Sequence, residues 1–489
     1  MTPNIKQLLT TPEGKILEFK RDLSSPKPLL KTLVAFANTA GGKLIIGVDD
    51  DQQIFGVEQP LDEEERLCNL IADSISPRLV PNVEFVTVEG KTLLVVEVFL
   101  SNLRPHWINA EGVDGGVYVR LGSTNRQADR ELIAELRRLV EGVSFDEMPM
   151  PELSVDDLDL TAAQALFGNS RTLDEQTLIT LKLLTRYQGR LVPTKGAILL
   201  FGKQRSFHFP DAWIQCGRFF GTEKIDIFDH SEIDQPLPKA VDEVMLFLKK
   251  HAFRGADLSG IRRKDVWNIP LGILREVVIN ALVHADYSQR GAPIRVVFLD
   301  DRIEIENPGL LLPGLTIEDM KQGTSRIRNT VIARVFRELH LIEQWGTGVC
   351  RIFAEARELG LREPEIVEIG MRLRFIVPLL EPLVISTKSK SLPSSGVESG
   401  VESGVESKMA RQIFSFLDES PLAKSEIAKS LGKTKPTRYL NDLMARLLRE
   451  GYVEYTIPEK PKSRLQKYRL TDKGRDIVES IEPAGKEEL

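Results

Sequence analysis

The spacing of apolar and polar residues in the first third of the chain predicts a compact unit of helices and strands. Apolar residues recur at the spacing of one helix face over 29–38, and Gly41 and Gly42 end that helix. The sequence KLIIGVDD follows at 43–50, a run rich in β-branched residues that predicts a buried strand ending in two carboxylates. The remaining expected elements are strands at 92–99 and 117–120 and a closing helix at 130–140.

A second region of helix and strand patterns lies in the middle of the chain. Apolar periodicity predicts a helix over 274–283, and PIRVVFLDDRIEIEN at 293–307 predicts two strands joined by a two-aspartate turn. A further helix is expected over 349–358, opened by the sequence Gly-Thr-Gly. His284 and Asp286, just after the first of these helices, are most simply interpreted as a hydrogen-bonded structural pair.

The last eighty residues have their own pattern of three helices and a hairpin. Ser425 is placed to cap the second helix and Gly432 to end it. Three helices followed by a two-stranded hairpin resemble a winged helix-turn-helix. The expected elements are helices at 410–417, 425–431 and 437–450, strands at 453–455 and 467–470, and a final helix at 471–481.

Glycine and serine mark the boundary before this region. Residues 386–407 read STKSKSLPSSGVESGVESGVES, with the tetrad GVES beginning at Gly396, Gly400 and Gly404. Such a composition cannot bury a core and predicts a flexible linker. The expected organisation is an N-terminal domain at 1–147, a middle domain at 148–385, this linker at 386–407, and a C-terminal domain at 408–489.

Composition and charge limit the class of protein. The 489 residues are 42% apolar and 28% charged, which is typical of a soluble chain of about three domains. The net charge of −6 excludes a uniformly basic nucleic-acid binder. Cys68, Cys216 and Cys350 form no CxxC pair, which favours a reducing cytoplasm. No signal peptide or bilayer-spanning run is evident, so no membrane partner is expected.

Positive charge is concentrated in the C-terminal domain. Residues 408–480 hold sixteen Lys and Arg against ten Asp and Glu, a balance of +6 that leaves −12 for the rest of the chain. This distribution favours duplex DNA as a partner, and a protein-binding winged helix with a solvated charged loop stays open. The basic residues lie at the start of the third helix, Lys433, Lys435 and Arg438, and in the hairpin loop, Lys460, Lys462 and Arg464.

Polar residues on the helix at 274–283 suit the chemistry of an ATP site. Glu276 and Asn280 are four residues apart and therefore share one helix face. An asparagine oxygen can ligate Mg²⁺, and a glutamate can accept the proton of an attacking water. Gly346, Thr347 and Gly348 lead into a helix N-terminus, an arrangement that binds phosphate.

The order ExxxN, then Asn-Pro-Gly, then Gly-Thr-Gly resembles a divergent GHKL ATPase domain with the Bergerat-type α/β sandwich. It is similar, over about 190–380, to the C-terminal ATP-binding module of proteins labelled "RecG-like", and PTKGAILLFGK at 193–203 matches that module's upstream portion. The resemblance implies Glu276 as general base, Asn280 as Mg²⁺ ligand and ATP as the nucleotide. It also implies adenine-pocket residues Asn307 and Gly309, ATP-lid residues Ser325, Arg326 and Asn329, and phosphate-binding residues Gly346, Thr347 and Gly348.

Two departures from that family favour ATP binding over rapid hydrolysis. Asn-Pro-Gly replaces the usual Asp-x-Gly-x-Gly, so the aspartate that bonds adenine is missing. The segment between that motif and Gly-Thr-Gly is short and has few glycines. The GxxxxGK[ST] sequence and helicase motifs are absent, so the label does not imply helicase activity.

The N-terminal region resembles the Schlafen-type AlbA-like domain. The matching pieces occur in the family's order, ILEFKRDLS at 16–24, AFANTAGGKLIIGVDD at 35–50 and GGVYVRLGSTNRQAD at 115–129. The family is associated with nucleic-acid binding, which makes Lys20, Arg120 and Arg126 candidate phosphate contacts.

Some members of that family are metal-dependent RNases, and the resemblance implies a corresponding metal site. The carboxylates concerned are Glu13, Glu18 and Asp49, which could hold Mg²⁺ or Mn²⁺ if they converge. The same residues also fit a simpler interpretation, with Glu18 and Lys20 alternating on a strand and Asp49 opening a turn.

Three functions are consistent with this α/β multidomain chain. The first is an ATP-responsive, DNA-binding regulator of the bacterial type. The alternative is a metal-dependent nuclease or defence effector acting on RNA or DNA and gated by the ATPase module. A purely structural assembly protein is the third. A homodimer or higher homo-oligomer is expected in each case, because GHKL and AlbA-like domains commonly self-associate.

Overall fold

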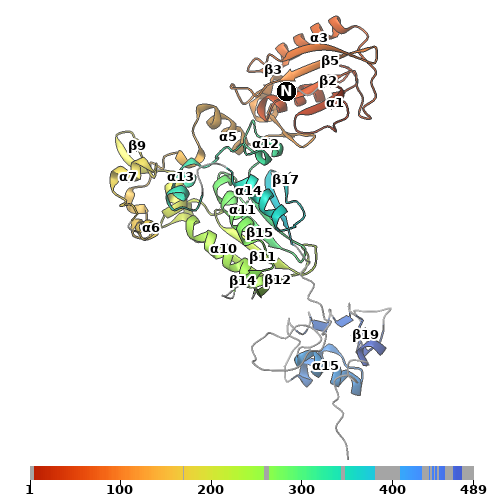
Figure 1. Ribbon diagram of the computed structural model, residues 1–489, viewed down its shortest axis with the longest axis vertical. Helices are drawn as coiled ribbons and strands as arrows, with labels where there is room; N and C mark the ends of the chain where they lie inside the picture. Colours follow the sequence, from red (N-terminus) through yellow and green to blue (C-terminus); the bar gives the residue numbers. More distant parts are fainter. Residues whose placement is uncertain are drawn as a thin grey trace, which may run out of the picture. The chain divides into compact units, whose positions relative to one another are not determined.

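The computed structural model describes residues 5–168, 170–257, 264–342, 347–379, 408–431, 440, 443–444, 447–448, 451–457 and 466–475. It divides into two compact units, Met1–Ile385 and Ser386–Leu489 (Figure 1). The predicted linker at 386–407 lies outside the described residues. Within the described ranges, no helix is long and apolar enough to cross a membrane.

The first unit begins with a four-stranded sheet of order β1-β2-β5-β4. Strand β1 is parallel to β2, and the other neighbours are antiparallel. Leu44 and Ile46 of β2 pack into the cluster that includes residues of α2 and α3, whereas Ile45 packs into a separate cluster with Phe19. The elements are β1 Leu17–Lys20, β2 Gly42–Ile46, β4 Asn82–Val88, β5 Lys91–Val98, α2 Pro26–Asn38 and α3 Pro60–Ser74.

The glycines after α2 are required by packing. A Cβ added at Gly42 would lie 2.7 Å from the Phe36 ring, and Gly41 has a φ of +75°.

The strand expected at 117–120 is β7, which pairs with β8 in a separate hairpin. The other elements of this part are α1 Ile5–Leu8, β3 Ile75–Ser76, β6 Trp107–Ile108, η1 Asn109–Glu111, α4 Gly112–Gly116, β7 Tyr118–Leu121, β8 Thr124–Gln127 and α5 Arg130–Glu141.

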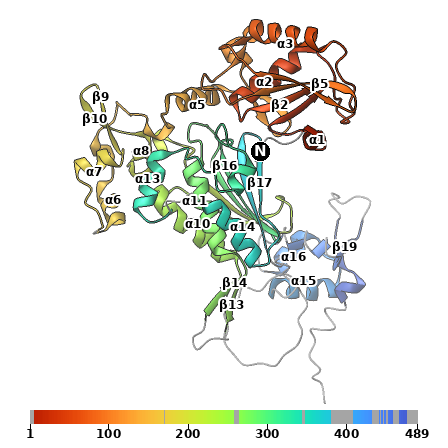
Figure 2. The same ribbon diagram turned by 45° about the horizontal axis from the view of Figure 1, so that its top comes forward.

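The middle of the chain forms a two-layer α/β structure. Its six-stranded sheet has the order β12-β11-β15-β16-β18-β17 and is antiparallel except between β11 and β15. Three helices, α10, α11 and α14, lie next to one another in the second layer (Figure 2). The bounds are β11 Ile214–Phe219, β12 Ile227–Ile233, β15 Ile294–Phe298, β16 Arg302–Pro308, β17 Glu365–Ile369, β18 Arg372–Pro378, α10 Leu237–His251, α11 Leu271–His284 and α14 Gly348–Glu358.

Smaller elements surround this sandwich. Helix α8 coincides with the sequence KGAILLF, is almost wholly buried, and is capped by the Thr194 hydroxyl, which accepts from the N–H of Ala197. The remaining elements are η2 Phe145–Glu147, η3 Val155–Asp157, α6 Leu160–Phe167, α7 Glu175–Thr180, β9 Leu184–Tyr187, β10 Arg190–Pro193, α8 Lys195–Phe201, α9 Arg205–His208, β13 Arg254–Asp257, β14 Lys264–Trp267, α12 Ile317–Lys321 and α13 Thr330–Glu338.

The second unit has a core of its own. Helices α15 Lys408–Glu419 and α16 Lys424–Ser430 pack against the antiparallel strands β19 Val453–Tyr455 and β20 Tyr468–Leu470. The expected cap at Ser425 is wrong. The N-cap is Ala423, whose N–H donates to the Glu426 carboxylate at 2.7 Å, and Ser425 lies inside the helix. Helical residues of the expected third helix are Leu440, Leu443, Met444, Leu447 and Leu448.

The basic residues expected to contact DNA in this unit are not among those described. They are Lys433, Lys435, Arg438, Lys460, Lys462 and Arg464, and the helix-ending Gly432 also lies outside the described ranges.

Candidate functional site

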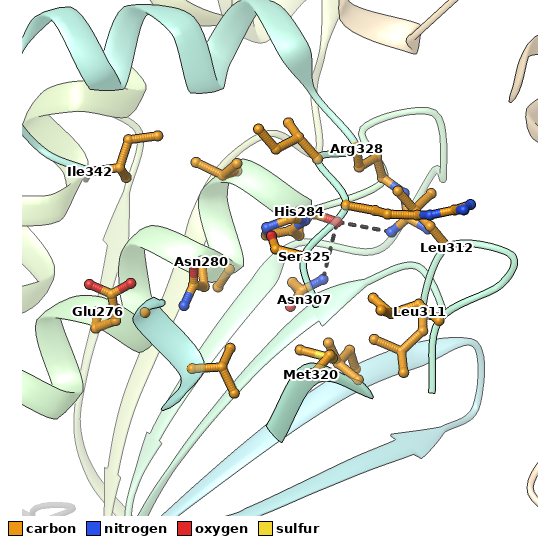
Figure 3. A pocket seen from close by; sticks show the side chains of 18 of the residues that line it. Glu276, Asn280, His284, Asn307, Leu311, Leu312, Met320, Ser325, Arg328 and Ile342 are labelled. Atoms are coloured by element: carbon orange, nitrogen blue, oxygen red, sulfur yellow. Dashed lines mark hydrogen bonds between the residues drawn. The ribbon is translucent and has the colours of Figure 1, made fainter. Parts of the chain in front are cut away.

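A pocket in the middle domain brings together most of the residues predicted for an ATP site. It is bounded by α11, by the loop that leads from β16 to α13, and by the first turn of α14 (Figure 3). Measured out to the solvent at its mouth, its empty volume is about 1170 Å³. The predicted residues that line it are Glu276, Asn280, Asn307, Ser325, Arg326, Thr347 and Gly348.

Glu276 is held at the first turn of α14. Its Oε2 accepts from the Arg351 guanidinium at 2.8 Å, and the Glu276 side chain is only 12% exposed. A Cβ added at Gly348 would lie 1.9 Å from Oε1 of Glu276. Only glycine leaves the Glu276 carboxylate in this position, because the first turn of α14 packs directly against it.

Asn280 lies one turn further along α11 and has a polar atom without a partner. Within the described part of the chain, its Nδ2 is buried and makes no hydrogen bond. Such a group has a free-energy cost unless a ligand or water satisfies it. The amide of Asn307 is already engaged, since its Nδ2 donates to the Pro308 carbonyl at 3.1 Å.

The charge of the pocket lining suits an anion. Four arginines and a single carboxylate, that of Glu276, line it. Burial and the nearby Arg328 guanidinium lower the pKa of His284 to about 4, so its ring is neutral near pH 7. Arg328 is compensated by Glu135 and Arg351 by Glu276, which leaves positive charge from the other two arginines, Arg326 and Arg337.

The far part of the pocket is apolar. In Figure 3, the side chains of Leu311, Leu312 and Met320 lie on the opposite side of the pocket from Glu276 and Asn280, whereas Ile342 lies on the same side as those two residues. A pocket with charged groups at one end and apolar walls at the other matches a ligand with a flat ring and an anionic tail. The labelled apolar residues are Leu311, Leu312, Met320 and Ile342.

Two predicted residues, Gly309 and Asn329, do not line the pocket. Gly346 is outside the described residues. Gly309 does not line the pocket; it has a φ of +100°, and a Cβ there would lie 2.2 Å from Nη1 of Arg328. Asn329 is fully buried, and its Nδ2 donates to the carbonyls of Val283 and Ala285 at 2.9 and 2.7 Å. Asn329 therefore fastens the end of α11.

The interpretation of His284 and Asp286 as a hydrogen-bonded pair is wrong. The Asp286 carboxylate accepts from Ser288 and Gln289, at 2.6 Å from the Ser288 hydroxyl. The His284 backbone carbonyl accepts from Arg328 at 2.9 Å. The two side chains face different cavities because the chain turns between them.

Sequence reasoning predicted Arg326 but missed the other three arginines of the pocket. Arg351 follows Gly348 by one helical turn, and that spacing on α14 is the only sequence signal for its contact with Glu276. Arg328 and Arg337 carry no such signal, because tertiary packing alone brings them to the pocket.

The N-terminal carboxylates are each engaged locally. Glu13 accepts from the N–H of Phe19 at 2.8 Å. Asp49 accepts from the N–H groups of Asp51 and Gln53, as in an aspartate-opened turn. Among the described residues, which include all three predicted carboxylates, no group of three acidic, histidine or cysteine side chains converges to hold a metal ion.

The predicted phosphate contact at Arg120 is replaced by a structural role. Its side chain is 0% exposed and bonds the Glu18 carboxylate, the Gly14 carbonyl at 3.0 Å and the Asn125 side chain at 3.0 Å. Lys20 also pairs with Glu18, at 2.7 Å. A fully buried guanidinium cannot reach a phosphate, whereas Arg126 on β8 is exposed.

This difference in burial predicts a large loss of stability when Arg120 is replaced and almost none when Arg126 is replaced. Arg120→Met should lower the free energy of unfolding by about 3 kcal/mol, because it leaves the buried Glu18 without its guanidinium partner. The matched exposed change, Arg126→Met, should stay within about 0.5 kcal/mol. Urea denaturation followed by circular dichroism measures both. Equal stability of the two variants would contradict the buried ion pair.

The fold and the pocket define a multidomain α/β protein with an anion-suited site in its middle domain. The sequence model of the "Schlafen, AlbA_2" family matches residues 13–129. The model described as "Putative ATP-dependent DNA helicase recG C-terminal" matches residues 291–377. The chain therefore contains a Schlafen, AlbA_2 domain joined to a RecG-type, ATPase-related domain, which confirms the Schlafen-type AlbA-like and RecG-like resemblances found in the sequence.

The matched segments leave part of the site outside them. Glu276 and Asn280 precede the RecG-type match, whereas Thr347 and Gly348 lie inside it. A third model, "Filamentation induced by cAMP protein Fic-like, C-terminal domain", matches residues 409–471, a likeness that the sequence patterns did not indicate. No curated protein matches the chain.

Two solved structures match the chain with low TM-scores. The crystal structure of the DIP2311 protein from Corynebacterium diphtheriae is 20% identical, with a TM-score of 0.41, and the match covers 96% of this chain and 94% of that one. The other is the solution structure of the "N-terminal Domain of Putative ATP-dependent DNA Helicase RecG-related Protein" from Nitrosomonas europaea. It is 30% identical, with a TM-score of 0.22, over 26% of this chain and 94% of that one.

Proposed function

We propose that the protein is an ATP-binding, DNA-binding regulator whose middle domain binds ATP with Mg²⁺ in the pocket described above. The observation that carries the proposal is the meeting of Glu276 and Asn280 on α11 with the glycine-started N-terminus of α14. These groups come from segments about seventy residues apart in the sequence, and the fold brings them to one cavity.

The residues present fit a nucleotide triphosphate. The first turn of α14 offers backbone N–H groups that lack partners within the helix, and Arg326 and Arg337 add positive charge. Leu311, Leu312 and Met320 offer apolar contact to a base. The Asn280 amide has capacity for a further contact, because its Nδ2 has no partner among the described residues, and a flip of the amide would present its oxygen to a ligand instead.

Bound Mg²⁺ would polarise a phosphoryl oxygen, and Asn280 is the residue that would hold it. Glu276 is the residue suited to accept a proton from water, because its carboxylate borders the same cavity. Arg351 fixes the orientation of that carboxylate but also occupies one of its oxygens. This pairing, together with the missing adenine-binding aspartate, supports slow turnover.

Two substitutions on α11 test the assignment. Asn280→Ala should abolish detectable Mg·ATP binding in isothermal titration calorimetry. Glu276→Gln should keep binding and reduce phosphate release by about a hundredfold or more, since an amide cannot act as a base. Hydrolysis by Glu276→Gln at the wild-type rate would show that the base is another group.

DNA binding is proposed for the C-terminal unit acting as a winged helix, with support from the N-terminal domain. The +6 balance of residues 408–480 and the order of α15, α16 and the β19–β20 hairpin support this. Arg126 offers an exposed guanidinium on the AlbA_2 domain. A homodimer would strengthen binding, because two tethered units act bivalently.

Purified protein incubated with RNA or duplex DNA and Mg²⁺ or Mn²⁺ separates this function from the nuclease alternative. Retention of intact duplex supports the regulator. Metal-dependent cleavage that is lost in Glu18→Ala would replace it with the nuclease.

A further inference from the structure

The loop after β16 belongs to the nucleotide pocket and to the N-terminal domain at once. Leu310 lines the pocket and is also buried in the cluster formed by Val119, Leu132 and Leu136. The other buried members of that cluster come from β7 with the residue before it, from Ala128 after β8, and from α5, all of which precede the middle domain. One side chain thus forms part of the pocket wall and part of the N-terminal packing.

An ion pair fixes the next residue of the loop. The N–H of Leu311 donates to Oε1 of Glu368 at 2.8 Å. Oε2 of Glu368 pairs with Nζ of Lys15, in the N-terminal domain, at 2.7 Å, and the Lys15 and Glu368 side chains are 12% and 6% exposed. The position of Leu311 in the pocket therefore depends on a nearly buried ion pair with Lys15.

A third contact joins the loop to the end of α2. The N–H of Gly314 donates to the Thr39 carbonyl at 2.6 Å. Gly314 has a φ of +80°, and a Cβ there would lie 2.7 Å from Cδ2 of Leu100. Glycine allows the loop to approach this closely.

Arg328 connects the other end of the loop to α5. Its Nε donates to Glu135 at 2.7 Å, while its Nη2 and Nη1 donate to the carbonyls of Leu310 and His284 at 2.6 and 2.9 Å. Burial raises the pKa of the Glu135 carboxyl, and Arg328 opposes that shift. Both side chains are nearly buried, so the pair is not screened by solvent.

We propose that the N-terminal domain forms the outer support of the nucleotide pocket, and that ATP occupancy is coupled to the packing of that domain through Lys15, Glu135 and the loop at 309–316. This inference rests on the proposed ATP site. Coupling is reciprocal: a ligand that orders the loop tightens the N-terminal packing, and disrupting that packing weakens the binding of the ligand. Lys15 and Glu135 are positioning residues, since they act through Leu311 and Arg328.

Lys15→Met tests the coupling because methionine retains most of the apolar stem and removes the charge. Glu368 would be left without its cation, and the anchor that sets the position of Leu311 would be weakened. Lys43→Met is the matched control, since Lys43 pairs with Glu97 at 2.9 Å inside the N-terminal sheet and does not touch the loop.

Titration of the full-length proteins with Mg·ATP gives the first readout. Lys15→Met should weaken binding about fivefold or more, the lower end of typical coupling between sites. Lys43→Met should match the wild type. Hydrogen exchange gives a second readout: Mg·ATP should slow exchange in the segments around Thr39 and Leu100 of the wild type, and this protection should disappear in Lys15→Met.

The outcomes separate the coupling from the ATP site itself. A wild-type protein that does not bind Mg·ATP overturns the proposed function. If the wild type and both variants bind Mg·ATP equally, and Mg·ATP does not slow hydrogen exchange around Thr39, the coupling alone is overturned. Should Lys15→Met fail to fold, Leu100→Ala replaces it, because Leu100 is only half-buried and lies against Gly314. Unchanged protection in Leu100→Ala then counts against the coupling.

Discussion

A Gly348→Ala protein is expected to fold and to lose ATP hydrolysis. Gly348 has no positive φ, so its backbone conformation suits alanine. The new methyl group would lie 1.9 Å from Oε1 of Glu276, so the carboxylate must move away. Displacing the proposed base should lower the rate of phosphate release by about a hundredfold or more.

A second glycine on the same pair of helices provides the control. A Cβ at Gly272 of α11 would lie 2.5 Å from Oε1 of Glu355 on α14, but neither residue lines the pocket. Gly272→Ala therefore makes a similar clash between a methyl group and a carboxylate, outside the site. It should turn over ATP at close to the wild-type rate.

Circular dichroism shows whether both variants fold, and phosphate-release assays compare their rates of ATP hydrolysis. If Gly348→Ala hydrolyses ATP as fast as Gly272→Ala, the packing of α14 against Glu276 has no part in the chemistry. If both variants lose activity equally, the packing of α11 against α14 is responsible and the specific displacement of Glu276 is rejected.

Helical spacing is enough to predict the α11 part of the pocket. Glu276 and Asn280 are four residues apart on a helix, so their common face follows from the period alone. The role of Gly309 could not be predicted in this way. Its glycine is required because the Arg328 guanidinium passes 2.2 Å from where a Cβ would lie, and no local pattern brings those two residues together.

Burial explains why the sequence predicted a phosphate contact for Arg120 in the N-terminal domain. Arg120 and Arg126 both lie on strands of one hairpin, and their charges look equivalent in the sequence. The fold places the Arg120 side chain against β1, where it meets Glu18, and leaves Arg126 outside. Which face of a strand is covered depends on segments distant in the sequence, and a single chain does not reveal it.

The main strands and helices follow the hydrophobic pattern closely, with β2, β5, α11 and α14 at the expected places. The segment at 151–210 gives little sequence signal, although it forms α6 to α9 and the β9–β10 hairpin. Its helices have eight residues or fewer, which is too short for helical periodicity to be distinguished from other patterns.

Removal of residues 408–489 is expected to abolish most duplex binding and to leave Mg·ATP binding intact. The remaining chain has a balance of −10 and repels phosphate, whereas the removed residues 408–489 have a balance of +4. The two units are compact by themselves, which supports separate ligand binding. Fluorescence anisotropy with a labelled duplex, at one fixed salt concentration, measures the decrease in affinity.

A full-length variant provides the sharper form of this test, because it keeps every domain. Changing Lys433, Lys435 and Arg438 together to glutamine should reduce the slope of log affinity against log salt by up to about 3, near one for each phosphate that no longer meets a cation. Deleting one GVES tetrad should change affinity far less, since the reach of a flexible linker varies as about the square root of its length. If the truncated protein instead binds duplex DNA as tightly as the full chain, the N-terminal domain is the main DNA-binding surface. Arg126 would then be the first residue to change.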